Sequence, residues 1–270
     1  MPELPEVETI RRGLVPLVTE STISGLTVRE RRLRWPIAPK LAGQVKGRRI
    51  SSIRRRGKYL LLEIDGGCLM IHLGMSGSLR YLSRPESPVL HDHYDIGLED
   101  GSMLRYNDPR RFGSLHFTRA PDEHPLLRDL GPEPLGDEFT GEYLWRRCRG
   151  RKSAIKQLIM SAGIVAGIGN IYANEALHRA GIHPSRAAGR ISLERMSRLR
   201  DEIRAVLEDA LRSGGTTLRD FVGSDGRPGY FRQSLSVYER ENEPCRRCAT
   251  TIVRRVLGQR ATYYCPTCQR

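Results

Sequence analysis

The sequence has no long apolar run. Its longest apolar stretches, such as Tyr-Leu-Leu-Leu at 59–62, are far shorter than the ~20 residues that a membrane-spanning helix requires. The N-terminal segment carries Glu3, Glu6 and Glu8 and no apolar core, which is not the pattern of a secretory signal peptide. Internal repeats and low-complexity tracts are also absent. These absences predict an intracellular protein without a membrane segment.

Acidic residues are in the minority. The chain has 45 Lys and Arg against 31 Asp and Glu, a formal net charge of +14. Between residues 29 and 58 twelve basic residues stand against one acid, Glu30. A solvated surface rarely becomes so one-sided, and the excess favours a polyanionic partner. Nucleic acid is preferred over an anionic membrane because no basic amphipathic helix or lipidation motif accompanies the charge.

Pro2 is a candidate nucleophile. Removal of Met1 would leave its ring nitrogen as a secondary amine, and α-amino groups titrate near ~7.7–8.0, where a useful fraction is neutral. A helix beginning directly after Pro2 would lower that value further through its dipole. Attack of a secondary amine on a sugar carbon gives an iminium, a good electron sink. Glu3 and Glu6 lie beside it as candidate general acids.

The hydrophobic pattern changes twice along the chain. Residues 4–18 read as a helix with apolar residues on one face. From about 23 to 118 short strands alternate with turns, including hairpins 58–64/68–73 and 94–98/103–106, which predicts an antiparallel sandwich or barrel capped by the helix. A Pro- and Gly-rich linker at 120–136 precedes helical periodicity at 154–159 and at 193–210, with Ser192 as N-cap of the latter.

One segment of the helical half is ambiguous. Residues 162–173 are too rich in glycine for a good helix. They suit either phosphate binding by backbone N–H groups or tight helix packing.

Four cysteines form the most specific motif. Cys245 and Cys248 are separated by two residues, as are Cys265 and Cys268, and sixteen residues lie between the pairs. This spacing predicts one structural Zn²⁺ held by four thiolates, with a hairpin of 251–253 and 261–264 between the knuckles. Two disulfides or a redox pair fit less well, because neither a secretory signal nor a thioredoxin-like context is present. Arg260, just before the second strand, is a candidate phosphate contact, and Cys68 and Cys148 read as ordinary half-buried residues.

Together these features resemble the formamidopyrimidine-DNA glycosylase family, bacterial repair enzymes that remove oxidised purines. The matching segments run in family order over essentially the whole chain: Pro-Glu-Leu-Pro-Glu-Val-Glu-Thr at 2–9, Arg-Gly-Lys-Tyr-Leu at 56–60, His-Leu-Gly-Met-Ser-Gly at 72–77, Asn-Asp-Pro-Arg-Arg-Phe-Gly at 107–113, Gly-Ile-Gly-Asn-Ile-Tyr at 167–172, Gly-Arg-Pro-Gly-Tyr-Phe at 226–231 and the cysteine quartet. Ser76 departs from relatives that carry an acidic residue there.

The resemblance implies an α+β multidomain fold. An N-terminal antiparallel β-sandwich with a capping helix would occupy residues 1–130. A helix–two-turns–helix domain with a lesion-binding loop at 216–230 would occupy 131–236, and a β-hairpin zinc ribbon 237–270. The expected partner is damaged double-stranded DNA, with no membrane and no organic cofactor, and the protein would be a monomer in the bacterial cytoplasm, associated with the nucleoid.

The resemblance also assigns roles to individual residues. Pro2 would attack the anomeric carbon and expel the base, and the iminium would permit β- and δ-elimination, with Glu3 protonating the sugar ring oxygen. Lys58 would be the third catalytic residue and would hold a phosphate that flanks the flipped nucleotide. The DNA contacts would come from His93, Arg110, Arg151, Lys156, Asn170 and Arg260. Met75, Arg110 and Phe112 would fill the vacated stack, and Arg219, Phe221 and Tyr230 would contact the lesion from the loop. Extrusion of a base costs a few kcal/mol, which is why the hole must be filled.

Two other interpretations stay open at the level of the sequence. An endonuclease VIII-like enzyme for oxidised pyrimidines shares the Pro-Glu start. A non-enzymatic zinc-ribbon DNA-binding protein would explain the charge and the zinc, but needs neither Pro2 nor Glu3. Borohydride trapping of a covalent iminium separates an enzyme from a binding protein.

Overall fold

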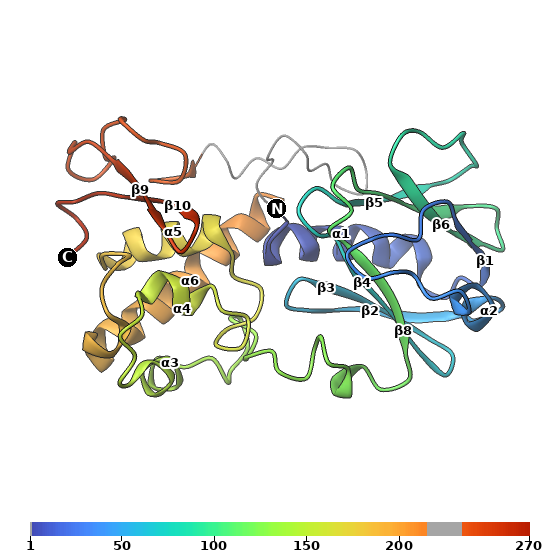
Figure 1. Cartoon of the computed structure of the whole chain (residues 1–270), viewed down its shortest axis with the longest axis horizontal. Coiled ribbons are helices and arrows are strands. Elements are labelled where there is room, and N and C mark those ends of the chain that lie inside the picture. The colour runs from blue at the N-terminus through green and yellow to red at the C-terminus, as the bar shows by residue number, and fades with distance from the viewer. Residues whose placement is uncertain (1, 215–233) are drawn as a thin grey trace. The chain divides into compact units, whose positions relative to one another are not determined.

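The computed structural model describes residues 2–214 and 234–270, which divide into two compact units (Figure 1). The first unit holds the described residues up to Arg128, together with Ser213 and Gly214. The second holds Asp129–Arg212 and residues 234–270. The three-domain division stays a prediction.

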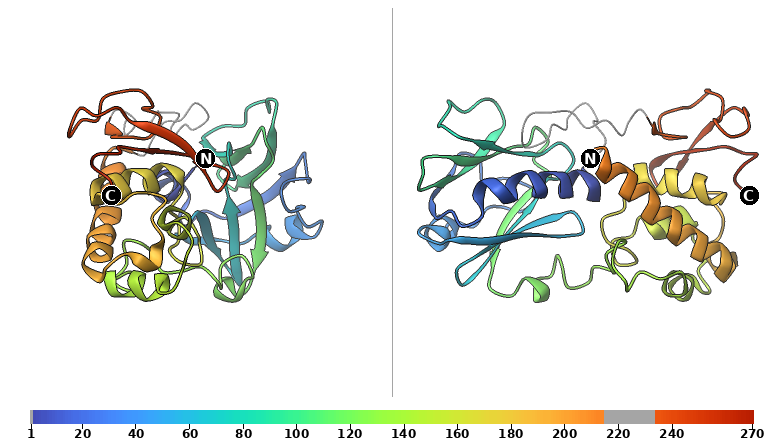
Figure 2. Two further views of the ribbon diagram at one scale, coloured as in Figure 1. Left: turned by 60° about the vertical axis from the view of Figure 1, so that its left-hand side comes forward. Right: turned by 180° about the vertical axis from the view of Figure 1, so that it is seen from behind.

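The first unit is a sandwich of two four-stranded antiparallel sheets (Figures 1 and 2). One sheet has the strand order β1-β6-β7-β5, with bounds Ile23–Val28, Asp92–Leu98, Met103–Asn107 and Ser78–Leu82. The other has the order β2-β3-β4-β8, with bounds Ile50–Arg56, Tyr59–Ile64, Gly67–His72 and Ser114–Thr118. Both predicted hairpins are present, β3 with β4 and β6 with β7.

Helix α1, Leu4–Val18, belongs to the core of the sandwich. Val7, Ile10, Leu14 and Val18 are fully buried and pack with apolar residues of both sheets. The helix predicted at residues 4–18 is confirmed with the same bounds. A short helix α2, Leu41–Val45, was not predicted, because one turn and a half gives too little periodicity to recognise.

The second unit is helical and carries a β-hairpin. Its helices are α3 Gly141–Cys148, α4 Ile155–Ile159, α5 Asn170–Ala180 and α6 Leu193–Arg212, and its strands are β9 Val253–Leu257 and β10 Arg260–Tyr264. Helix α6 packs on α3 and α5, and β10 lies against α5. Ser192 caps α6 as predicted, since its hydroxyl accepts the N–H of Arg195 at 3.4 Å. Two one-turn 3₁₀ helices, Pro121–Glu123 and Ala188–Arg190, complete the described elements.

The structure differs from three of the sequence predictions. The first ribbon strand begins at Val253, so Thr251 and Ile252 precede it. The last four residues of 162–173 are helical, because its glycines end at Gly169 and leave a helix-compatible sequence from Asn170. Cys68 and Cys148 are fully rather than half buried, with exposed fractions of 0% and 1%. A thiol packs as a small apolar group, so complete burial costs it little.

Candidate functional site

The N-terminal end of α1 presents Pro2 and two buried carboxylates. Pro2 is buried and directly precedes Glu3, the N-cap residue of the helix. The exposed fractions of Glu3 and Glu6 are both 2%. The N–H of Glu3 donates to Oε2 of Glu6 at 2.9 Å, which satisfies one of the unpaired donors at the helix start. The chain thus brings the sequence-predicted nucleophile and both candidate acids to the positive end of one helix.

Lys58 lies in the two-residue turn between β2 and β3, where Arg56 pairs with Tyr59. The ring of Tyr59 packs 4.7 Å from that of His72, the last residue of β4. Burial, followed by the positive charges of Lys58 and Arg34, lowers the pKa of His72 to about 4. Sequence reasoning did not single out His72 for a role, although it opens the matching segment 72–77.

Two loops of the sandwich bring Met75, Arg110 and Phe112 together. Nη1 of Arg110 lies 4.0 Å from Sδ of Met75, and Phe112 is 45% exposed, unusual for a phenylalanine. The backbones of the loops touch: a Cβ on Gly74 would lie 2.5 Å from the carbonyl carbon of Phe112. Gly74 has φ +69°, so glycine is favoured there by both conformation and space.

His93 is buried in the first unit. It is 5% exposed, and its Nε2 forms a 2.7 Å hydrogen bond with the carbonyl oxygen of Asp108. The ring donates to that carbonyl and so holds the loop that follows β7. Unlike Arg110, His93 is not exposed at the surface.

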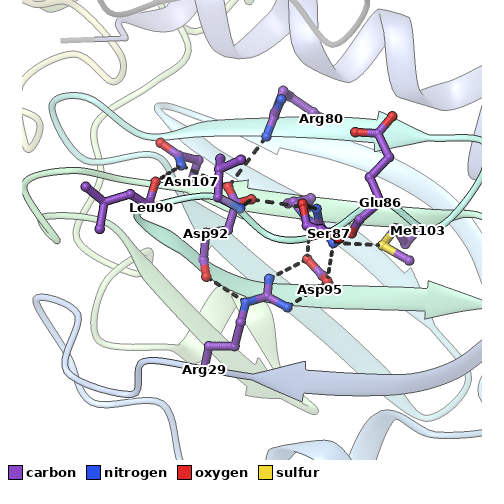
Figure 3. Close-up of polar contacts among 11 residues, drawn as sticks. Arg29, Arg80, Glu86, Ser87, Leu90, Asp92, Asp95, Met103 and Asn107 are labelled. Carbon is purple, nitrogen blue, oxygen red and sulfur yellow. Dashed lines mark hydrogen bonds and ion pairs between the residues drawn. The ribbon is translucent and has the colours of Figure 1, made fainter.

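A buried ion-pair network stiffens the sheet that leads into this loop (Figure 3). Arg105 on β7 is 2% exposed and binds both oxygens of Asp95 at 2.9 Å, and Arg29 binds the same carboxylate at 2.7 and 2.8 Å. Burial alone would raise the pKa of Asp95, but the hydrogen bonds from Arg29 and Arg105 outweigh it and lower the pKa. Asn107, the last residue of β7, donates to Asp92 at 2.9 Å.

Much of the basic run is ion-paired in the folded chain. At least five of its arginines contact carboxylates, as the pairs Arg29–Asp95, Arg32–Glu30, Arg49–Glu20, Arg54–Glu63 and Arg55–Glu8. Four of these acids lie outside the run, which is why the sequence count suggested a more one-sided surface.

In the second unit, Lys156 and Asn170 converge on the ribbon hairpin. Lys156 is 1% exposed, and its Nζ donates to the carbonyl of Ala261 at 2.9 Å and to Oγ1 of Thr262 at 2.7 Å. Asn170, the first residue of α5, donates to the same carbonyl at 3.0 Å. Arg260 is exposed at the start of β10, next to Ala261. Asn170 and Arg260 therefore lie close together at the start of β10. Lys156 is instead a buried side chain that hydrogen-bonds α4 to the hairpin. Arg151 is exposed just after α3.

Glu175 on α5 is a residue that sequence reasoning missed. Its side chain is fully buried and accepts the backbone N–H groups of Ser236, Val237 and Tyr238 at 2.8, 2.9 and 2.9 Å. A glutamate in a helix is normally exposed, so nothing in the pattern marks this one. It anchors the chain immediately before the ribbon.

The four ribbon cysteines fit a tetrahedral Zn²⁺ site. Their Sγ atoms lie within 4.8 Å of one another, with Cys248 3.4 Å from both Cys265 and Cys268. Four thiolates at the usual Zn–S distance would be about 3.8 Å apart, whereas a disulfide needs about 2.0 Å. All four are free cysteines. They hold one structural zinc ion, and a site with four protein ligands leaves no open position for catalysis.

The predicted lesion loop lies outside the described residues, as do Arg219, Phe221 and Tyr230. Among the residues that are described, no helix combines the length and the hydropathy needed to cross a membrane.

The β-sandwich, the helical unit and the four-thiolate ribbon define a zinc-finger protein of the helix–two-turns–helix class. Three family models cover the chain: the formamidopyrimidine-DNA glycosylase N-terminal domain matches residues 1–115, its H2TH domain 130–222, and the zinc finger found in FPG and IleRS 242–270. The chain belongs to the formamidopyrimidine-DNA glycosylase family.

Similar proteins match over their full length. The formamidopyrimidine-DNA glycosylases of Methylococcus capsulatus and Alkalilimnicola ehrlichii are 56% and 54% identical, with 100% of each chain covered. The MutM (Fpg) crystal structure from Thermus thermophilus has a TM-score of 0.90 and 41% identity, covering 99% of this chain and 98% of that one. A variant of the Lactococcus lactis enzyme in complex with a Fapy-dG-containing DNA has a TM-score of 0.92 and 33% identity, with both chains fully covered.

Proposed function

We propose that this chain is a bifunctional DNA glycosylase and AP lyase that excises oxidised purines, 8-oxoguanine and formamidopyrimidines, from duplex DNA. The observation that carries the proposal is the match of family and fold over the whole chain, with relatives solved on Fapy-dG-containing and abasic-site-containing DNA. Membership of that family favours this proposal over the pyrimidine-directed sister group and over a non-enzymatic ribbon protein. The Pro2-Glu3 start also favours an enzyme, because a protein that only binds DNA needs neither residue.

The proposed mechanism begins at Pro2. After removal of Met1, its nitrogen attacks the anomeric carbon of the extruded nucleotide, the bond to the base breaks, and loss of the ring C–O bond gives an iminium. Glu3 protonates the ring oxygen as that bond opens. The iminium acidifies the neighbouring carbon, so β-elimination and then δ-elimination release the flanking phosphates. Glu3 and Glu6 are both buried at the helix end that carries Pro2, which supports the assignment of the reaction to this place.

The remaining assignments divide between contact and positioning. Lys58, Asn170, Arg260 and Arg151 bind backbone phosphates, and Met75, Arg110 and Phe112 fill the space left by the nucleotide. The inward hydrogen bonds of His93 and Lys156 favour a positioning role for these two. Arg219, Phe221 and Tyr230 contact the lesion from the loop at 216–230. The enzyme works as a monomer on chromosomal DNA, in the nucleoid, and its lesion loop and zinc ribbon belong to separate domains, 131–236 and 237–270.

Borohydride trapping on labelled duplexes tests the reaction. A covalent adduct should form on 8-oxoguanine opposite cytosine and disappear in Pro2→Gly, because only an amine nucleophile gives a reducible iminium. Glu3→Gln should also abolish base excision, whereas both variants should bind the lesion duplex almost as wild type does. Glu194→Gln, an exposed glutamate in the first turn of α6, is the matched control and should retain full activity.

Three outcomes would contradict these assignments. Trapping mainly on an oxidised pyrimidine would move the protein to the sister specificity. Equal loss of binding in the Pro2 and Glu3 variants would show a structural rather than a chemical role. No adduct from folded, zinc-loaded protein would leave only a DNA-binding function.

A further inference from the structure

Asp108 lies where the loops carrying Met75, Arg110 and Phe112 meet. It directly follows β7, and its exposed fraction is 0%. Its carboxylate accepts four hydrogen bonds: at Oδ1 from the Ser76 hydroxyl at 2.8 Å and the Arg110 N–H at 3.3 Å, and at Oδ2 from the Gly113 N–H at 2.9 Å and the Tyr106 hydroxyl at 3.1 Å. A single buried side chain thus joins both loops to the sheet.

The main chain of Asp108 is held as firmly as its side chain. Its N–H donates to the carbonyl of His91 at 3.1 Å, and its carbonyl accepts from the His93 ring at 2.7 Å and from the N–H of Arg111 at 3.1 Å. His91 and His93 flank Asp92 in the sequence. Asp92 belongs to the ion-pair network of Figure 3, in which it contacts Arg105 and Asn107. The backbone of Asp108 is therefore hydrogen-bonded to the segment that contains this network.

The two loops approach each other and Tyr106 closely at two glycines. A Cβ on Gly77 would lie 2.6 Å from the Tyr106 hydroxyl, and one on Gly74 would lie 2.5 Å from the backbone nitrogen of Gly113. Burial and the neighbouring Asp108 carboxylate raise the pKa of Tyr106 well above its ordinary value, so its hydroxyl stays protonated and available as a donor.

We propose that Asp108 is a positioning residue that locks loop 73–77 to loop 108–113, so that Met75, Arg110 and Phe112 enter the duplex in fixed register. The proposal deepens the proposed function and rests on it. A buried carboxylate is tolerated where several donors satisfy it, and these donors are left unpaired when it is removed. Loss of the lock would leave Pro2 and Glu3 unchanged. It would make the positions of the three side chains that fill the vacated stack less fixed.

Two substrates separate this role from a general structural one. Excision of 8-oxoguanine opposite cytosine requires extrusion of a stacked base, whereas an abasic site has no base to extrude. In Asp108→Asn we expect the single-turnover rate of 8-oxoguanine excision to fall about 100-fold, the scale of a misplacement of about 1 Å. Borohydride trapping on the abasic duplex should stay close to wild type. Ser76→Ala, which removes one of the four hydrogen bonds, should give a smaller loss with the same substrate preference.

Asp100→Asn is the matched control. Asp100 also accepts hydrogen bonds from the hydroxyl and the N–H of a serine, Ser102, but in the exposed turn between β6 and β7. It should behave as wild type on both duplexes. Equal losses on both duplexes in Asp108→Asn, or no loss on either, would overturn the lock.

Hydrogen exchange of the free protein tests the Asp108–Gly113 hydrogen bond without relying on the proposed enzymatic activity. The Gly113 amide should exchange faster in Asp108→Asn than in wild type, because its acceptor is weakened. Unchanged exchange would overturn the lock even if the variant were a poor enzyme. Failure of wild-type protein to trap either duplex would instead reject the proposed function, and the exchange rate would still decide the contact.

Discussion

His72 is held in its neutral form by its surroundings. Its Nδ1 accepts the N–H of Gly74 at 3.0 Å, which a protonated ring nitrogen cannot do. Burial, followed by the charges of Lys58 and Arg34, lowers its pKa to about 4. Protonation would therefore break a hydrogen bond at the base of the loop that carries Met75.

This neutral histidine makes folding stability depend on pH. The unfolded chain has an ordinary histidine pKa near ~6.5, so between that value and about 4 only the unfolded state binds the proton. The stabilisation of the folded state that comes from this neutral histidine is fully present above pH ~6.5. It decreases by up to about 3 kcal/mol as the pH falls toward 4. Urea denaturation at pH 7.5 and pH 4.5 should show a smaller drop for His72→Gln than for wild type. Identical drops would contradict the assignment.

At the residue scale, the sequence predicts chemistry that depends on local spacing. The cysteine quartet could be recognised because its spacing is a short pattern with one main chemical use, whereas the catalytic roles of Pro2 and Glu3 stay predictions. The inward bonds of His93 and Lys156 could not, since their partners, Asp108 and Ala261, are set by tertiary packing. Glu175 was missed for the same reason.

At the scale of elements, α5 anchors the chain that leads to the ribbon. Three backbone N–H groups donate hydrogen bonds to the Glu175 carboxylate. Glu175→Gln replaces one acceptor oxygen by a donor facing those N–H groups. We expect a loss of about 2–3 kcal/mol in the free energy of unfolding, measured by urea denaturation.

The exposed Glu208 on α6 offers a control for this variant. Glu208→Gln makes the same chemical change on a helix surface and should cost less than about 0.5 kcal/mol. Equal stability of the two variants would show that the Glu175 contacts contribute little.

Elements with long periodic patterns were predictable, and short ones were not. The bounds of α1 follow from its apolar face, and the pairing of β6 with β7 follows from alternation around an acidic, Gly-containing turn. Helix α2 and the start of β9 depend on packing rather than on local preference. The glycine content of residues 162–173 predicts no good helix, yet α5 begins at Asn170, directly after the last glycine of the segment.

At the scale of the whole molecule, zinc supplies the stability that the small hydrophobic core of the ribbon cannot supply. The buried cluster of the ribbon consists of Val237, Cys245, Ile252 and Cys265, and two of these four are metal ligands. So small a cluster cannot stabilise a fold by burial alone. Removal of zinc by a chelator, or Cys248→Ala, should therefore unfold the ribbon and abolish binding of a lesion duplex, measured by fluorescence anisotropy.

Cys148→Ala provides the comparison, because Cys148 is buried in α3 and is not a ligand. It should keep both its zinc and its DNA affinity. Chelated protein that still bound the duplex with wild-type affinity would show that the ribbon is dispensable for binding.

The ion pairs of the basic run have a consequence for the way salt would act on this protein. A lysine or arginine that meets a phosphate drives binding by releasing condensed cations from the DNA, and each such contact steepens the fall of affinity with salt. An arginine that already holds a carboxylate, as Arg54 holds Glu63, must exchange one anion for another and gains less. The affinity of this enzyme for DNA should thus be less sensitive to ionic strength than its formal charge of +14 suggests, and a larger share of it should come from the shape of the lesion site.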